Sequence, residues 1–420
     1  MNKLLSHTLC ACILTCGLTA CAESAGSQAP YQLTKEDIRI EVPQGGFTVQ
    51  VDQLLRINVQ SLSDENVNYR WTLNGETIST NKNLEHMFTS PGTYELTLTA
   101  TQGDISFSYT FTVNVISDEE PDKPGNITAY ITQVLDYVPA PGQFVNLMPQ
   151  YEEGDTQESM NRKVLEAIGY NNKGIISLGG FGGYVTLGFD HTIENREGLC
   201  DFRVLGNAHN GNSEPGVIQV AYDANRNGHP DEDEWYEIAG SAHRNPEGEA
   251  WIEQARKAGN NVNLYKGYAI TYYRPDSEPE GFTEQYIYWE DNKGHKGYKA
   301  KNTYHAQSYF PQWIETQSMT FQGTCLPQNA IDDSGNGSYF VLHRFDYGYA
   351  DNYTNAEEGT AIDIDWAITE EGNAANLPGA DFIRIYTGIN QENGWIGECS
   401  TEISGVEDLH MTGEEIVSAK

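Results

Sequence analysis

The sequence contains few cysteines. Three of the seven lie within the first twenty residues, and a fourth, Cys21, follows directly. Only Cys200, Cys325 and Cys399 remain for the folded part, which allows at most one disulfide and one free thiol. No Cys-x-x-Cys or His-x-x-x-His pairing is present, so a zinc site is not indicated. We therefore expect a hydrophobic core to stabilise the fold.

Positive charge is also scarce. The chain has 25 Lys plus Arg against 60 Asp plus Glu, which gives a net charge of −35, and no basic stripe offsets it locally. Such a surface repels the phosphates of nucleic acid, so nucleic acid is excluded as a partner. The acidity is compatible with solubility at a cell surface and with binding of divalent cations.

The familiar catalytic motifs are missing. There is no Gly-x-Ser-x-Gly elbow and no His-Glu-x-x-His helix. The glycine-rich segment "LGGFGGYVTLGF" lacks the spacing of a phosphate-binding loop and leads into a strand instead of a helix. Carboxylate pairs such as Asp363 and Asp365 are so common among 60 acids that none indicates a glycosidase. The sequence favours binding over catalysis, and we do not expect an enzyme.

Long apolar runs are absent after the first twenty residues, "MNKLLSHTLCACILTCGLTA". This opening has a basic start, an apolar centre and small residues before Cys21, as a secretory signal does. "LTAC" at 18–21 resembles the lipobox of bacterial lipoproteins, in which residues 1–20 are removed and Cys21 carries acyl chains. The membrane contact is then the lipid anchor only, and residues 21–35 form a polar tether.

Residues 36–116 contain short alternating strands separated by turn signals about every ten residues, which is typical of a β-sandwich. The segments "YRWTLNG" (69–75) and "FTSPGTYELTLTA" (88–100) resemble the PKD domain. That resemblance implies an immunoglobulin-like sandwich with Trp71 at its centre, which usually serves as a spacer. The charged, proline-bearing segment 117–126, "SDEEPDKPGN", is the expected linker.

Residues 127–420 are interpreted as one larger domain. Segments such as "YVTLGF", "GVIQVAY" and "DFIRIYTGI" alternate with a period of two between Gly/Asn/Asp-rich loops. Two helices interrupt them: one at 155–168, expected to open with a capping box from Asp155 to Glu158, and one from Pro246 to Gly259. The fold class is thus all-β dominated, with the PKD-like sandwich followed by a jelly-roll-like β-sandwich domain with helical insertions.

A calcium pattern lies between two expected strands, in "DANRNGHPDEDE" (223–234). Gly228 stands at the sixth position, where the EF-hand loop turns sharply, although the flanks are not helical. The oxygen ligands would be the side chains at positions 1, 3, 5, 9 and 12 and one backbone carbonyl: Asp223, Asn225, Asn227, Asp231, Glu234 and His229. The hypothesis is a structural calcium loop, and the alternative is a solvated acidic turn.

A ligand site is expected between residues 265 and 313, where thirteen aromatic residues occur in 49 positions. Exposed tyrosines and tryptophans suit sugars, corrin rings and other partly apolar ligands. The candidate rings are Tyr272, Tyr273, Trp289, Tyr309 and Trp313, and the candidate polar partners are Asn292, Asn302 and Gln307. His305 is the one histidine of "NTYHAQSYFPQW", either a structural residue or a metal ligand.

The large domain also resembles a group of PKD-bearing cell-surface lipoproteins of gut Bacteroidota. The segments that carry the resemblance are "DYVPAPGQFVN", "GGFGGYVTLGFDHTIEN", "NTYHAQSYFPQWI" and "RFDYGYADN". Some of that group are similar to accessory lipoproteins of cobalamin-uptake loci. This implies a lipid-anchored protein on the surface of the outer membrane that binds cobalamin or another corrinoid and passes it to a TonB-dependent transporter. The alternative is a glycan-binding lipoprotein of a polysaccharide-utilisation system.

Overall fold

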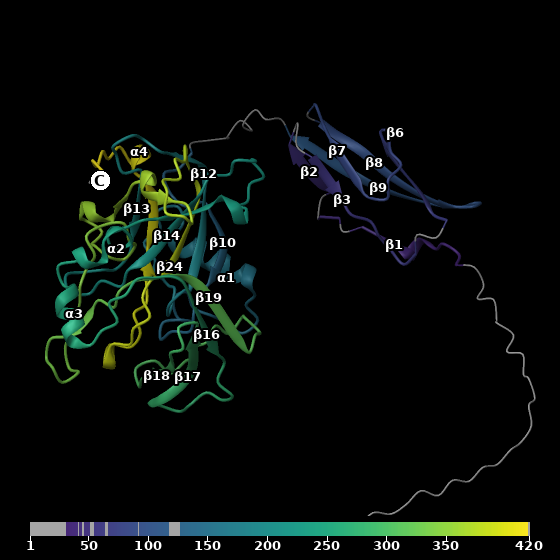
Figure 1. Ribbon diagram of the computed structural model, residues 1–420. Coiled ribbons are helices and arrows are strands. Elements are labelled where there is room, and N and C mark those ends of the chain that lie inside the picture. The colour runs from purple at the N-terminus through teal and green to yellow at the C-terminus, as the bar shows by residue number, and fades with distance from the viewer. Residues whose placement is uncertain are drawn as a thin grey trace, which may run out of the picture. The chain divides into compact units, whose positions relative to one another are not determined.

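A computed structural model describes residues 31–40, 42–43, 46–50, 54–63, 66–90, 92–116 and 127–418. The chain divides into two compact units, Met1–Gly125 and Asn126–Lys420 (Figure 1). The expected signal peptide, the lipidated Cys21, most of the tether and the expected linker at 117–126 lie outside the described residues. Among the described helices, none combines the length and the apolar character needed to span a membrane.

The first unit is built on a five-stranded sheet with the order β2-β9-β8-β5-β6, in which β2 runs parallel to β9 and the other pairs are antiparallel. Shorter pairs, β1 with β4 and β3 with β7, complete it. The bounds are β1 Ile38–Arg39, β2 Phe47–Gln50, β3 Leu54–Ile57, β4 Gln60–Ser61, β5 Asn68–Leu73, β6 Glu76–Ser79, β7 Leu84–Met87, β8 Gly92–Gln102 and β9 Ile105–Ile116.

Trp71 is the centre of this unit, as the sequence predicted. Its side chain is fully buried, and its indole Nε1 donates a hydrogen bond to the carbonyl of Lys82 at 3.2 Å. Asn74 and Gly75 adopt φ values of +47° and +90° and form the tight turn between β5 and β6, which explains the Asn-Gly pair. The predicted all-β sandwich is confirmed here.

The second unit contains a six-stranded antiparallel sheet with the order β10-β12-β24-β14-β15-β23 (Figure 1). Its strands are β10 Gln133–Val138, β12 Tyr184–Glu194, β14 Gly216–Ala221, β15 Trp235–Ile238, β23 Ala367–Ile368 and β24 Gly379–Thr387. One face of this sheet, including Val185, Ile218 and Ile383, is fully buried. Along each strand the residues of this face alternate with residues of the other face, which is the period of two that the sequence showed.

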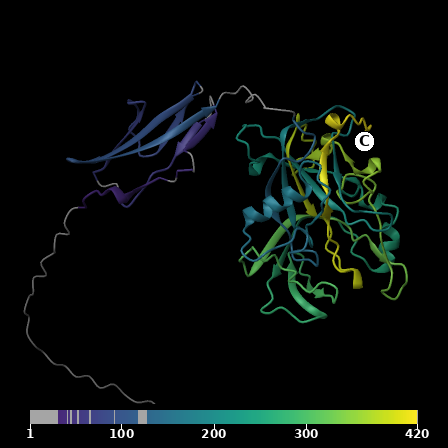
Figure 2. The ribbon, with the colours of Figure 1, turned by 180° about the vertical axis from the view of Figure 1, so that it is seen from behind.

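The buried face packs into one core with a three-stranded sheet, β22-β13-β26, and with helix α1. These elements are β13 Phe202–Leu205, β22 Ala361–Ile362, β26 Gly405–Asp408 and α1 Gln157–Ile168. The view from behind in Figure 2 shows α1, which contacts β10. The helix is capped by Thr156 with Ser159, not by Asp155 with Glu158 as expected, because the chain becomes helical one residue later.

A four-stranded sheet, β18-β17-β16-β19, carries most of the aromatic-rich segment. Its strands are β16 Tyr265–Tyr273, β17 Thr283–Asp291, β18 Lys296–Lys301 and β19 Ser318–Cys325. The remaining elements are two short strand pairs, β11 Ile176–Ser177 with β25 Glu402–Ile403 and β20 Ala330–Asp332 with β21 Phe340–Leu342, and helices α2 Ser241–Arg244, α3 Ile252–Ala258 and α4 Leu409–Thr412. Cys200, Cys325 and Cys399 are buried free thiols.

Candidate functional site

The most exposed aromatic rings of the second unit that share a pocket are those of Tyr304 and Trp395, whose exposed fractions are 76% and 59%. They line a pocket of about 370 Å³, which we call the Tyr304–Trp395 pocket. A volume in this range suits a small-molecule ligand. The other lining residues are aromatic or apolar (Phe144, His305, Ile396), amides (Gln143, Asn207, Asn212, Asn302) and acids (Glu214, Glu402).

Gln143 connects the two sides of the pocket. Its Nε2 donates to the carbonyl of Ile396 at 2.6 Å, next to Trp395, and its Oε1 accepts from Asn302 Nδ2 at 2.7 Å. The backbone carbonyl of Gln143 accepts from Gln307 Nε2 at 2.6 Å. Gln143 thus links the segment of Trp395 and Ile396 to the segment of Asn302 and Tyr304. The backbone beside both aromatic rings is therefore held in place before a ligand binds.

The loop of Tyr304 and His305 is closed by Asn302, whose Oδ1 accepts from the backbone N–H groups of both residues at 2.9 and 3.0 Å. The His305 ring packs edge-on against Phe144 with a centroid distance of 4.9 Å. Burial lowers the pKa of His305, so the imidazole is neutral near pH 7. Its ring nitrogens form no hydrogen bond with the residues that the structure describes, so they are available to a ligand in the pocket.

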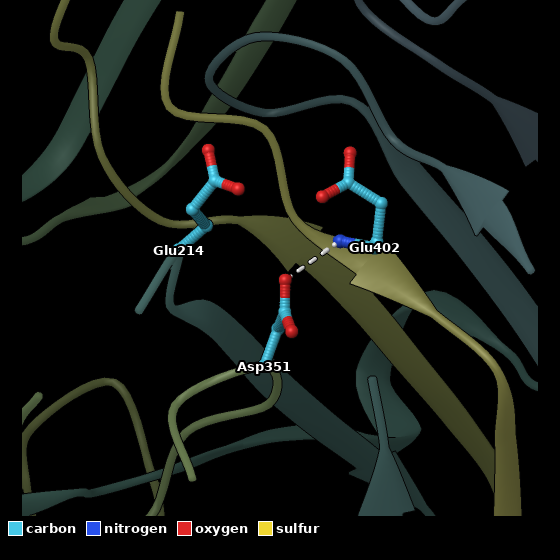
Figure 3. A group of neighbouring side chains, drawn as sticks. All are labelled: Glu214, Asp351 and Glu402. Carbon is cyan, nitrogen blue, oxygen red and sulfur yellow. Dashed lines mark hydrogen bonds between the residues drawn. The ribbon is translucent and has the colours of Figure 1, made fainter. Parts of the chain in front are cut away.

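Three acids converge behind the pocket, and we call them the acid cluster: Glu214, Asp351 and Glu402 (Figure 3). One ligand oxygen from each lies within 4.8 Å of the others, and in the described part of the chain this is the only such group of three acid, histidine or cysteine side chains. The backbone N–H of Glu402 donates to Asp351 Oδ2 at 3.0 Å, the dashed line in Figure 3. Glu214 and Glu402 line the pocket, whereas Asp351 lies outside its lining.

Hydrogen bonds orient the carboxylates of the cluster. Asp351 Oδ1 accepts from the backbone N–H groups of Asn207 and Ala208 at 2.9 and 2.8 Å. Glu402 Oε1 accepts from the hydroxyl groups of Ser177 and Ser400. With the bond from the Glu402 N–H, both oxygens of Asp351 are held, whereas Glu402 Oε2 has no hydrogen bond to a described residue.

The cluster holds protons at neutral pH. Burial raises the pKa of Glu402 to about 8 and that of Asp351 to about 7, and the Asp351 carboxylate adds to the effect on Glu402. Burial, together with Glu402 and Asp351, raises the pKa of Glu214 well above its usual value. The cluster therefore offers protonated carboxyl groups as hydrogen-bond donors, or carboxylate oxygens of the kind that Ca²⁺ and Mg²⁺ bind.

Three rings that the sequence proposed for the ligand lie in the core instead. Tyr272 is fully buried and donates to the carbonyl of Phe181 at 3.3 Å. Tyr309 is 1% exposed, and Trp313, at 9%, stacks on Tyr137 with a centroid distance of 5.6 Å. The expectation that these rings form a binding surface is corrected: strand alternation and packing direct them inward.

The other proposed residues are divided. Asn302 and His305 line the Tyr304–Trp395 pocket, and Gln307 supports it from behind. Three further residues lie outside the lining of that pocket: Tyr273, which donates to Glu290 at 2.6 Å, and Trp289 are on the four-stranded sheet, and Asn292, in the turn between β17 and β18, donates to the carbonyl of Gly267 at 2.8 Å.

Sequence reasoning missed Trp395 and the acid cluster. A lone tryptophan in the Gly/Asn-rich segment "ENGWIGE" was an available signal, because such loops run over the surface. Glu214 lies more than one hundred residues before Asp351, and Asp351 lies 51 residues before Glu402, so no local pattern brings the three acids together.

The proposed calcium loop is compact. Gly228 has φ +77°, which provides the turn needed at the sixth position, and its N–H donates to Asp223 Oδ2 at 2.7 Å. Asp231 Oδ2 accepts from the side-chain amides of Asn225 and Asn227. Glu234 accepts from backbone N–H groups through both oxygens, so it caps the loop. The backbone of His229 is held by Asn227. The loop brings the proposed ligands together, and calcium binding stays a prediction.

Comparisons with solved structures give low similarity. A quinonprotein alcohol dehydrogenase-like protein from Bacteroides thetaiotaomicron is 16% identical over 24% of this chain, with a TM-score of 0.16, and the match spans only 23% of that protein. A SusE-like protein is 10% identical over 89% of this chain and 97% of its own, with a TM-score of 0.20. A Bacteroides ovatus protein of a mixed-linkage glucan utilization locus, in complex with a heptasaccharide, is 10% identical over 84% of this chain and 100% of its own, with a TM-score of 0.18. These scores are too low to carry an argument about fold or ligand.

No curated protein matches the chain. The model of the PKD domain matches residues 41–115, which contain Trp71 and the "YRWTLNG" segment. The match covers most of the described part of the first unit. The chain therefore carries a PKD domain at residues 41–115, as the sequence predicted.

Proposed function

We propose that the second unit binds a carbohydrate in the Tyr304–Trp395 pocket. The observation that carries the proposal is that two highly exposed aromatic rings share one pocket with four amide side chains and two acids. The C–H faces of a sugar pack on aromatic rings, and its hydroxyl groups exchange hydrogen bonds with amides and carboxyl groups. The Gln143 bridge keeps both rings in position, which lowers the entropic cost of binding.

The proposed role is binding and not hydrolysis. A glycosidase needs one ionised and one protonated carboxyl group at the sugar, so the environment must move the two pKa values apart. In the acid cluster, burial raises the pKa of Glu214 and of Glu402 in the same direction. The environment thus does not move the pKa values of these two acids apart, and both are suited to hydrogen bonding with sugar hydroxyls.

A corrinoid is the second candidate ligand, and His305 is the observation that favours it. Its neutral imidazole lines the pocket without a hydrogen-bonding partner among the described residues, as a ligand to cobalt requires. Against this, the pocket has only two widely exposed rings to cover a broad corrin disc. If the lipobox at Cys21 is used, either ligand would be captured at the outer-membrane surface, for delivery to a transporter.

The experiment is a glycan array followed by calorimetry on each ligand found, with cobalamin as a parallel arm. We expect a glycan to bind and Tyr304→Ala and Trp395→Ala each to weaken its affinity about 10-fold or more, since one ring contributes on the order of 1–3 kcal/mol. Phe282→Ala is the matched control, because Phe282 is 62% exposed and lies outside the pocket lining.

Three outcomes decide between the alternatives. Glycan binding that is lost in both ring variants and kept in the Phe282 variant supports the proposal. A cobalamin spectrum that shifts with the wild type and not with His305→Ala would instead assign the pocket to a corrinoid. Release of new reducing ends from the bound glycan would show hydrolysis and contradict the binding role.

A further inference from the structure

A row of polar side chains crosses the six-stranded sheet on the face opposite its buried core. The strand register places Asp136 opposite Thr186, Thr186 opposite Arg384, Arg384 opposite Gln219 and Gln219 opposite Glu237. Because side chains alternate along a strand, these five point to one side of the sheet. The row therefore forms a polar strip across five adjacent strands, with Thr186 buried and the other four partly exposed, and none of its residues lines the Tyr304–Trp395 pocket.

Arg384 is the centre of this row and is held in a fixed orientation. Its guanidinium carbon lies 4.2 Å from the ring centroid of Trp235 and 5.1 Å from that of Tyr184. Its Nε donates to Thr186 Oγ1 at 3.0 Å. The aromatic rings pack against the guanidinium, and Thr186 binds its Nε. The two terminal nitrogens, which form the fork, are therefore left to bind a ligand in the plane of the group.

The terminal nitrogens of Arg384 have no protein partner in the part of the chain that the structure describes. Among the described residues, no carboxylate lies within 4.0 Å of them, and the nearby acid of the row, Asp136, acts on Arg384 only through its charge. Burial lowers the pKa of Arg384, and the charges of Tyr184 and Asp136 oppose that effect. A half-buried guanidinium that no carboxylate contacts directly is costly, and a bound anion would offset that cost.

A cavity of about 750 Å³ lies over this part of the row. Besides Arg384, its lining includes Lys266, Gln219 and Gln322, whose side chains likewise form no hydrogen bond with described residues. Glu237 also lines it, as a carboxylate whose two oxygens accept hydrogen bonds from His243, Thr324 and Tyr386; against the effect of burial, these partners lower its pKa. The acids Glu232 and Glu370 are solvent-exposed, where water and salt screen their charge.

We propose that this cavity binds a small ligand through a carboxylate that pairs with the guanidinium fork of Arg384, with Lys266 and Gln219 as further donors. A planar carboxylate matches the fork with two parallel hydrogen bonds, which a neutral sugar cannot form. Uronic acid sugars and small organic acids both carry such a planar carboxylate. The site is separate from the proposed carbohydrate pocket and does not depend on it.

The test is calorimetry on the full protein with digalacturonic acid, its neutral counterpart galactobiose, and succinate. We expect at least one carboxylate to bind at millimolar concentration or below, and galactobiose to be weaker. Arg384→Gln should weaken carboxylate binding about 10- to 100-fold, the cost of losing charged hydrogen bonds. Arg384→Lys should retain part of the affinity, because it keeps the charge and loses the fork. Tighter binding of digalacturonic acid would indicate a sugar acid as the ligand, and tighter binding of succinate would indicate a free organic acid.

Arg256→Gln is the matched control, because that arginine pairs with Glu247 at 2.7 Å on the surface and lies outside the cavity. Near-UV circular dichroism checks the fold of each variant. If the Arg384 variants do not fold, the exposed Lys266→Gln variant should still weaken carboxylate binding severalfold. Absence of carboxylate binding to the wild type, or equal affinity of the wild type and a folded Arg384→Gln protein, would overturn the proposal.

Discussion

The four-stranded sheet and the Tyr304–Trp395 pocket use the same kinds of side chain in opposite ways. In and beside the sheet, Tyr272 and Tyr309 are buried and their hydroxyl groups bond to the protein backbone. In the pocket, Tyr304 lies on a loop and Trp395 on the short 3-10 helix Gly394–Ile396, and both are mostly exposed. The dense segment 265–313 thus supplies core rings as well as one exposed ring of the pocket, Tyr304, whereas the second pocket ring, Trp395, stands alone in a polar segment.

The largest expected effect tests the core side of this comparison. Tyr272→Ala removes a fully buried ring, so we expect the free energy of unfolding to fall by about 3–5 kcal/mol. Denaturant unfolding followed by tryptophan fluorescence measures it, and Tyr304→Ala should stay within about 0.5 kcal/mol of wild type. A comparable loss in both variants would remove the distinction between core and pocket.

The second effect concerns the floor of the pocket. The pKa values of Asp351 and Glu402, about 7 and about 8, lie above their usual values, so the folded protein keeps protons that the unfolded chain has released. Stability then falls as pH rises from about 5 to about 8, by about 1.4 kcal/mol per pH unit for each such proton.

Unfolding in EDTA across this pH range measures the slope. Glu402→Gln should flatten it, and the exposed Glu153→Gln should leave it unchanged. A wild-type stability that rises over the same range would show that the cluster is ionised in the folded protein.

The third effect distinguishes the acids of the proposed calcium loop, 223–234, from those of the acid cluster. We expect Ca²⁺ at about 100 times its dissociation constant to stabilise the protein by about 2.7 kcal/mol through loop 223–234. Asp231→Asn should abolish this shift in melting temperature, and Glu402→Gln should retain it. The reverse result would move the ion to the acid cluster, and no shift in the wild type would refute the calcium loop.

The smallest effect on stability is expected at the exposed rim. Trp395→Ala loses the 3.2 Å hydrogen bond from its indole to the carbonyl of Ser338, which is worth about 1 kcal/mol. Trp395→Phe loses the same hydrogen bond but keeps an aromatic face, so it should retain more glycan affinity than the alanine variant. Equal affinity of the two variants would argue against stacking on this ring.

Local patterns predicted much of the fold. The PKD-like sandwich with Trp71 buried, the helix at Gln157–Ile168 and the end of α3 at Gly259, with φ +91°, each follow from neighbouring residues. The expected start of that second helix at Pro246 is wrong, because Pro246–Gly248 forms a separate 3-10 helix and α3 begins at Ile252. The site was predicted only at Asn302 and His305, with Gln307 behind them. The period of two in a strand predicts that one of Tyr272 and Tyr273 faces inward. It makes no prediction for Tyr309 and Trp313, which lie outside the strands and are covered by other segments.

The sequence alone determined the alternation of the strands, the acidic surface, the turn at Asn74-Gly75 and the PKD domain, because each depends on residues close together in the chain. Only the tertiary structure decided which rings are exposed, that Glu214, Asp351 and Glu402 meet, and that no carboxylate of the described residues contacts Arg384. These properties depend on distant segments that pack together, and packing sets the burial and the neighbouring charges from which both proposed sites derive their chemistry.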